Sequence, residues 1–122
     1  MISSSNPLQP LVDALRAFAA ERAWEQFHTP KNLACALSVE AAELLEHFQW
    51  LTPEQSQNLP ADKRARVAEE IADIQAYLVR IADKLEIDIL DAVEGKIRLN
   101  EAKYPANKVR GDARKYDEYP AE

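Results

Sequence analysis

The sequence predicts an all-α protein, and three observations support this fold class. Only 2 of the 122 residues are glycine, which counts against turn-rich β folds, a dinucleotide-binding fingerprint and a glycine-rich phosphate loop. The 7 prolines leave three proline-free stretches that are long enough for helices. Apolar residues recur within those stretches at helical spacing, and the sequence shows neither an internal repeat nor the alternation of a strand.

The first two helices are expected over residues 10–25 and 30–50. In the first, apolar residues share one face of the helix. The second is preceded by Thr29, whose side chain suits an N-cap, and it begins with a proline at the first helical position. Residues 52–55 (TPEQ) repeat this start signal with a glutamine that completes a capping box, so a short helical turn is expected before Pro60.

The third long helix, expected over residues 61–84, has the clearest apolar stripe. Its members follow one another at steps of three or four residues: Val67, Ile71, Ile74, Leu78, Ile81 and Leu85. Asp88 is placed to cap a fourth helix that ends near Tyr104, and residues 106–122 are expected to form an irregular tail. Residues 1–122 are expected to form a single domain, because 13.8 kDa supports one modest core.

The start of the second helix indicates self-association. Residues 33–37 (LACAL) are apolar around the whole helix circumference, whereas a surface helix of a small monomer shows a polar side. Such a segment is either the central helix of a bundle or part of a subunit interface. With four long helices available, we expect a four-helix bundle-like fold assembled as a homodimer or homotetramer.

Charge and cysteine content limit the partners. The net charge of -6 argues against nucleic acid, where a basic face supplies most of the affinity. It still allows a phosphorylated small molecule if metal ions mediate the contact. A single cysteine fits a reducing cytosol, residues 1–6 lack the basic and apolar regions of a signal peptide, and the longest apolar runs are far short of a membrane span. A cytoplasmic location with no membrane partner is therefore expected.

Four acidic residues have the spacing of a metal site. Glu40 and Glu43 lie three residues apart on the second helix, and Glu70 and Asp73 repeat that spacing on the third. At about 100° per residue, each pair covers roughly 60° of its helix and lies roughly 90° from the apolar stripe. Antiparallel packing through the stripes would bring the four carboxylates to one cleft, where oxygen ligands suit Mg²⁺ or Mn²⁺. The alternative is that both pairs are ordinary acids on solvated helix faces.

Aromatic and basic residues have two interpretations each. Trp24 and Trp50 are either core or interface residues or surfaces on which a base stacks, and Trp50 is expected on the polar side of the second helix, just beyond Glu43. His47 falls between the two acids of that helix in angle, which allows a contact with substrate but favours a hydrogen bond to a metal ligand. One set shares a face of the fourth helix and would either contact outer phosphates or form a solvated basic face: Lys96, Asn100 and Lys103.

Several segments together resemble one enzyme family. Residues 18–33 (FAAERAWEQFHTPKNL) resemble the opening of the dCTP pyrophosphatase branch of the MazG-like family. Residues 40–43 (EAAE) and 70–73 (EIAD), with 26 residues between them, are similar to its Glu-x-x-Glu and Glu-x-x-Asp signatures. The end of the fourth helix through residues 103–105 (KYP) and the tail over residues 110–116 also resemble the family, so the similarity covers about residues 11–117.

The resemblance implies an all-α nucleoside triphosphate pyrophosphohydrolase that cuts between the α- and β-phosphates and releases pyrophosphate. It implies that Mg²⁺ is held by four acids, Glu40, Glu43, Glu70 and Asp73, and that Glu40 or Glu43 positions the attacking water. It also implies a nucleoside side of the pocket lined by five residues: Trp24, His28, Asn32, Trp50 and Tyr77. The expected substrates are dCTP-like or modified nucleotides. The alternatives are a related enzyme acting on dUTP or phosphoribosyl-ATP, and a non-catalytic helical dimerisation module.

Overall fold

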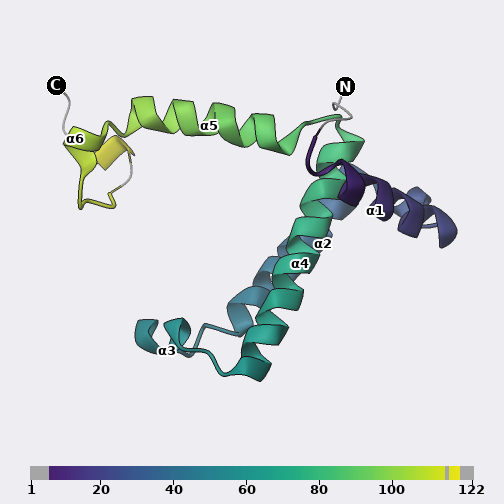
Figure 1. Cartoon of the computed structure of the whole chain (residues 1–122), viewed down its shortest axis with the longest axis horizontal. Helices are drawn as coiled ribbons and strands as arrows, with labels where there is room; N and C mark the ends of the chain where they lie inside the picture. Colours follow the sequence, from purple (N-terminus) through teal and green to yellow (C-terminus); the bar gives the residue numbers. More distant parts are fainter. Residues whose placement is uncertain (1–5, 115, 119–122) are drawn as a thin grey trace. The chain divides into compact units, whose positions relative to one another are not determined.

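The structure is a computed structural model that describes residues 6–114 and 116–118, and every regular element in these ranges is helical (Figure 1). The predicted all-α class is therefore confirmed. The elements follow in this order: α1 (Gln9–Glu21), the 3₁₀ turn η1 (Glu25–Phe27), α2 (Pro30–Glu46), α3 (Pro53–Gln57), α4 (Ala61–Lys84), α5 (Ile89–Lys103), α6 (Ala106–Val109) and the 3₁₀ turn η2 (Tyr116–Glu118).

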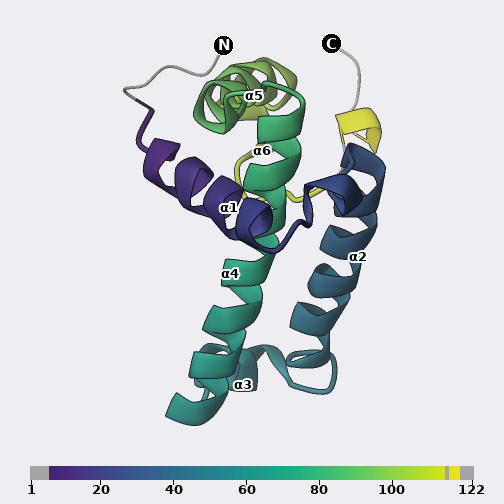
Figure 2. The same cartoon turned by 90° about the vertical axis from the view of Figure 1, so that its right-hand side faces the viewer.

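The chain forms two compact units, and the candidate site lies in the first, residues 1–88. Within this unit α2 and α4 run antiparallel, with α3 in the connection between them and α1 against the C-terminal half of α4 (Figure 2). The predicted antiparallel pairing of the two acid-bearing helices is thus present. No helix in the described ranges is both long and apolar enough to cross a membrane.

The predicted helix starts are present with the predicted caps. The Thr29 Oγ1 atom accepts a hydrogen bond from the backbone N–H of Asn32 at 3.2 Å. At α3 the Gln55 backbone N–H donates to Thr52 Oγ1 at 3.1 Å, and the Thr52 backbone N–H donates to Gln55 Oε1 at 2.9 Å. This reciprocal pair is the capping box expected from TPEQ, and it satisfies donors that have no partner inside the helix.

Two helices end earlier than predicted. Helix α1 stops at Glu21 because Ala23 adopts a left-handed conformation (φ 54°), after which the Trp24 backbone N–H donates back to Ala19 O at 2.9 Å. Helix α2 stops at Glu46, where the next residues close tighter turns through three-residue hydrogen bonds such as that from the Phe48 N–H to Leu45 O, 2.9 Å. The prediction that Trp50 is helical is therefore wrong, and its side chain is 86% exposed in the following turn.

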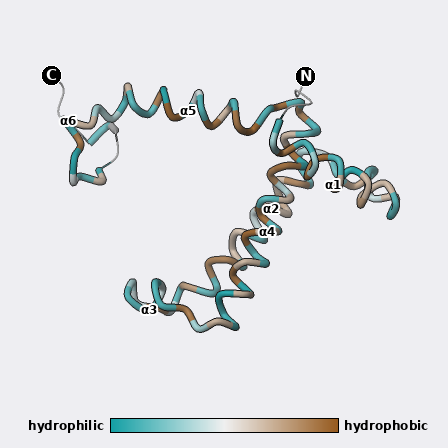
Figure 3. The backbone as a smooth tube through the Cα atoms, viewed as in Figure 1, coloured by the Kyte–Doolittle hydropathy of each residue, from teal (hydrophilic) through white to brown (hydrophobic). Residues whose placement is uncertain are grey.

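The buried core of the described chain is small. It consists of six apolar residues, Val12, Ala19, Leu33, Val67, Val79 and Ala82. Much of the predicted α4 stripe lies outside it, since Ile71 is 54% exposed and Leu85 is 51% exposed, and Figure 3 shows apolar residues recurring along α4. Cys35 is exposed as well. The helices packed on α4 in this chain cover only part of its apolar circumference.

The second unit, residues 89–122, contains α5, α6 and η2. Helix α5 ends at Lys103, next to the predicted end near Tyr104, and most of its apolar residues are exposed, with Val93 at 51% and Ile97 at 50%. The tail expected to be irregular contains two short helical turns, α6 and η2, within its described part. Lys115 of the tail motif and residues 1–5 lie outside the described residues. The single domain expected from chain length stays a prediction.

Candidate active site

Three carboxylates meet between the antiparallel helices α2 and α4. One oxygen each from Glu40, Glu43 and Glu70 lies within 4.8 Å of the others, and all three side chains are half-buried. The three-residue spacing puts the first two on one face of α2, and the packing of α4 against that helix brings in the third. We refer to these three residues as the acid cluster.

The carboxylates of the acid cluster repel one another when they are ionised. Burial is the largest effect that raises the pKa of Glu40, followed by hydrogen bonding to Glu43 and by its charge, and the result is a pKa of about 7. The Oε2 atoms of Glu40 and Glu70 are buried and have no hydrogen-bond partner among the described residues. Buried acceptors without a donor are costly, and a hard divalent cation satisfies such oxygens, so the donor set fits Mg²⁺ or Mn²⁺.

Asp73, the fourth predicted acid, lies at the edge of the acid cluster. Its side chain is exposed, and no oxygen of Asp73 belongs to the group within 4.8 Å. Its charge still contributes to the raised pKa of Glu40. The structure thus brings three of the four predicted acids together and leaves Asp73 near them, one turn of α4 beyond Glu70.

Two side chains, those of His47 and Tyr77, lie close to the acid cluster. The His47 Nε2 atom lies 3.8 Å from Glu70 Oε1, so this ring is next to one carboxylate of the acid cluster. Burial, followed by the charges of Glu40 and Asp73, raises the pKa of the Tyr77 phenol. Tyr77 is half-buried on α4, one turn after Asp73, and lies close enough to the acid cluster for its pKa to respond to these charges.

The predicted nucleoside-side residues lie near both ends of α2. Trp24 and His28 precede this helix and form an edge-to-face pair with ring centroids 6.3 Å apart, and Trp24 is 44% exposed. Asn32, in the first turn of α2, uses its side-chain Nδ2 to donate to Phe27 O at 3.0 Å. Trp50 follows the other end of the helix, and the 17 residues of α2 span about 25 Å. The two tryptophans are therefore not brought together within one chain.

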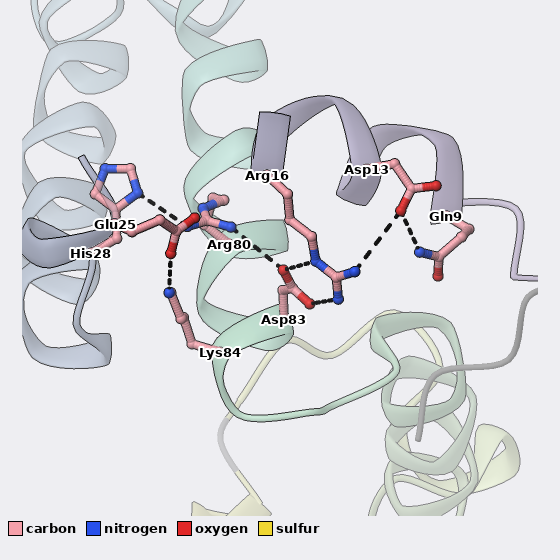
Figure 4. A network of polar contacts seen from close by, with 8 residues as sticks. All are labelled: Gln9, Asp13, Arg16, Glu25, His28, Arg80, Asp83 and Lys84. Carbon is pink, nitrogen blue, oxygen red and sulfur yellow. Dashed lines mark hydrogen bonds and ion pairs between the residues drawn. The ribbon is translucent and has the colours of Figure 1, made fainter. Parts of the chain in front are cut away.

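A buried arginine anchors the segment before α2, and the sequence analysis missed it. The Arg80 side chain is 5% exposed; its Nη2 donates to Glu25 Oε1 at 2.9 Å and lies 3.3 Å from His28 Nδ1 (Figure 4). Its Nη1 donates to Asp83 Oδ2 at 3.4 Å. The signal that would have found it is a lone arginine within the apolar run of residues 77–82 (YLVRIA), although its partners Glu25 and His28 lie 55 and 52 residues away.

Further ion pairs complete this network. Arg16 of α1 donates through Nε to Asp83 Oδ2 at 2.8 Å, and Lys84 pairs with Glu25 (Figure 4). The hydrogen bond from Arg16 lowers the pKa of Asp83, and the hydrogen bond from Lys84 lowers the pKa of Glu25. Burial, and then the Arg80 charge, lowers the pKa of the His28 imidazole. The network therefore joins α1, η1 and α4 through charged groups.

The two lysines and one asparagine predicted to contact phosphates lie on α5. Lys96, Asn100 and Lys103 are all exposed and occupy positions three or four residues apart, which places them on one face of the helix. The shared face expected from the sequence is present in the second unit. Their role toward phosphate stays a prediction.

Comparisons with known proteins identify relatives along most of the chain. A family model described as MazG-like matches residues 35–119. The human dCTP pyrophosphatase 1 is 45% identical over 105 residues, which cover 84% of this chain and 62% of that protein. The bovine dCTP pyrophosphatase 1 is 43% identical over 120 residues, covering 96% of this chain and 71% of that protein. This chain thus spans less than two thirds of the human relative.

A solved structure supports the same relationship. The crystal structure of a pyrophosphatase from Archaeoglobus fulgidus DSM 4304 is 40% identical to this chain and superposes with a TM-score of 0.78. The match covers 86% of this chain and 98% of the archaeal one. The helical fold described above therefore extends over nearly all of that protein.

Proposed function

The chain belongs to the MazG-like family, and we propose that it is an Mg²⁺-dependent nucleoside triphosphate pyrophosphohydrolase that removes dCTP-like or modified nucleotides from the pool. The observation that supports this most strongly is the acid cluster, with its two buried oxygens that receive no hydrogen bond from the part of the chain that the structure describes. A scaffold protein has no need to concentrate half-buried anions, whereas an enzyme that binds a triphosphate with an acidic protein needs them to hold cations.

The acid cluster and Asp73 would hold the metal. The ion supplies charge neutralisation for the triphosphate, a water of lowered pKa and stabilisation of the leaving pyrophosphate. In the hydrolysis, the water oxygen bonds to the α-phosphorus, and the bond from that phosphorus to the oxygen bridging to the β-phosphorus breaks. The water proton passes to Glu40 or Glu43, and the products are the nucleoside monophosphate and pyrophosphate.

The remaining predicted residues would orient the nucleotide. Trp24 and Trp50 are both exposed and are proposed to stack on the base, and Tyr77 lies near the carboxylates. His28, just before α2, and Asn32, in its first turn, are proposed to contact the nucleoside. Three polar residues of α5 are proposed to contact the outer phosphates: Lys96, Asn100 and Lys103.

Exposed apolar side chains support a homo-oligomer. On α2 Val39 is 57% exposed and Leu45 is 59% exposed, and on α4 Ile71 and Leu78 are also exposed. Burying such side chains against a second copy gains free energy in proportion to the apolar area removed from water. We propose a cytoplasmic homodimer or homotetramer, in agreement with the apolar start of α2.

The test is a panel of natural and modified nucleoside triphosphates, incubated with the protein and Mg²⁺, with product identification by chromatography. We expect dCMP and pyrophosphate from dCTP, and loss of turnover when Mg²⁺ is chelated. Primary release of dCDP and orthophosphate would contradict the cleavage position. Preferred turnover of dUTP or phosphoribosyl-ATP would favour the related enzymes, and no turnover of any nucleotide would favour the dimerisation module.

A further inference from the structure

We infer that Arg80 is a positioning residue that holds His28 in the neutral tautomer with its proton on Nε2, so that the ring presents an N–H donor to an acceptor atom of the nucleobase. This inference rests on the proposed function, and it concerns an arginine that lies outside the acid cluster. The residues involved are Arg80 on α4 and the segment before α2 that carries Trp24, Glu25 and His28.

The tautomer follows from the chemistry of the two groups in contact. A guanidinium has only donors, so the 3.3 Å contact between Arg80 Nη2 and His28 Nδ1 is a hydrogen bond only if Nδ1 has no proton and accepts. A neutral imidazole with a bare Nδ1 carries its proton on Nε2, on the other side of the ring. Figure 4 shows the second ring nitrogen of His28 directed away from Arg80.

The surroundings keep the imidazole neutral. The charged groups facing it are the guanidinium of Arg80 and the ammonium of Lys84, which oppose protonation, and the carboxylate of Glu25, which favours it. Glu25 already accepts from Arg80 Nη2 at 2.9 Å and pairs with Lys84, so two cations share its charge. Partial burial of the ring acts in the same direction as the cations.

Arg80 is a costly residue to bury. Its side chain is 5% exposed, and its Nε has no hydrogen-bond partner among the described residues. Replacing a buried ionic group by an apolar one is often neutral or stabilising, so stability alone does not account for it. Its fork reaches Glu25 and His28 with one nitrogen and Asp83 with the other, which ties η1 and the His28 ring to α4 in one orientation. Because His28 also meets the exposed Trp24 ring edge-to-face, this orientation sets the donor beside a base-stacking surface.

The first test needs no variant. In the ¹⁵N-labelled full chain, the ring nitrogens of the two histidines, His28 and His47, are assigned by comparison with His47→Gln. We expect His28 Nδ1 at neutral pH to show the shift of an unprotonated ring nitrogen and Nε2 that of a protonated one. A proton on Nδ1, or a doubly protonated ring at neutral pH, would overturn the inference.

The second test is a double-mutant cycle in dCTP hydrolysis. Arg80→Met and His28→Gln are each expected to raise the KM about three- to tenfold, the worth of one neutral hydrogen bond, with a smaller change in kcat. The double variant should be no worse than His28→Gln, because Arg80 acts through that ring. Arg80→Lys, which keeps one donor, should recover part of the loss.

Arg16→Gln is the matched control. It removes an ion pair of the same network, to Asp83, without a contact to His28, so it is expected to leave the KM unchanged. Additive effects of Arg80→Met and His28→Gln, or an equal effect of Arg16→Gln, would show a purely structural role and overturn the inference. Absence of nucleotide hydrolysis in the wild-type chain would overturn the proposed function, whereas hydrolysis with a KM insensitive to Arg80→Met overturns this inference alone.

Discussion

Neutralising Glu43 is expected to raise stability without metal and to lower it with metal. At 4.8 Å, two ionised carboxylates repel by about 3.5 kcal/mol at an effective dielectric constant of about 20 and by about 0.9 kcal/mol in water. The acid cluster is half-buried, so Glu43→Gln should stabilise the metal-free protein by about 1–3 kcal/mol above pH 7. This corresponds to a Tm increase of roughly 4–12 °C in a domain of this size.

The effect has a defined pH window. The pKa of Glu40 rises from its ordinary 4.5 to about 7 in the folded chain, so between these values the folded state binds more protons than the unfolded state. The free energy of unfolding of the metal-free wild type should therefore fall as pH rises through this range. Glu43→Gln removes one of the charges that raise the pKa of Glu40, so the decrease in the free energy of unfolding with pH should be smaller in this variant. The variant should therefore gain little stability over the wild type below pH 4.5.

Mg²⁺ should reverse the order of stabilities. A site filled at a thousandfold excess over its Kd gains about 4.1 kcal/mol, which exceeds the advantage of the metal-free variant, and only the wild-type site keeps the full ligand set. Thermal melts with chelator and with Mg²⁺, beside pyrophosphate release, measure both effects. Glu69→Gln, an exposed acid on the same helix as Glu70, serves as the control and should change neither. Near-native turnover of Glu43→Gln, or a wild-type Tm that ignores Mg²⁺, would show that the acids are only a solvated helix face.

Three further perturbations follow from single residues. Trp50→Ala should raise the KM about tenfold through lost base stacking, worth about 1–3 kcal/mol, while the Tm of this 86% exposed position stays constant; the reverse pattern in kinetics and melting would contradict the stacking role. Leu45→Glu puts a charge at an exposed apolar position and should shift the species seen by light scattering to a smaller mass. A wild type that is a monomer at micromolar concentration would contradict this prediction. The hydrogen bond from Arg16 lowers the pKa of Asp83, so the ionised carboxylate stabilises the folded state above its ordinary pKa. This contribution to the free energy of unfolding is lost as pH falls through the lowered pKa. Acid denaturation below pH 5 should therefore show a smaller loss of stability in Asp83→Asn than in the wild type.

The helices and their starts could be predicted from the sequence because their causes are local. The caps at Thr29 and Thr52 are hydrogen bonds between residues three apart, and the apolar stripe of residues 61–84 marks α4 with its observed bounds. The spacing of Glu40 and Glu43 also places both acids on one face of α2 without any knowledge of the rest of the chain. These features depend on a few consecutive residues.

The tertiary structure decided which predicted residues meet. Glu70 lies in the acid cluster and Asp73 is exposed, because the contact of each with the acids of α2 depends on how α4 packs against that helix. The end of α2 at Glu46 was also missed: local three-residue hydrogen bonds close the chain there, so Trp50 lies in an exposed turn.

The anchoring of His28 by Arg80 depends on tertiary structure alone. The two residues are 52 positions apart, and the left-handed Ala23 before η1 reverses the chain so that His28 reaches α4. Helical periodicity marks Arg80 only as a charged residue in an apolar run, since the spacing of residues along one helix contains no information about a partner on another element. The sequence by itself determined where helices form and which face each acid occupies, whereas the packing of α1, η1 and α2 on α4 determined which charges are buried together, because that burial exists only once the segments have been brought into contact.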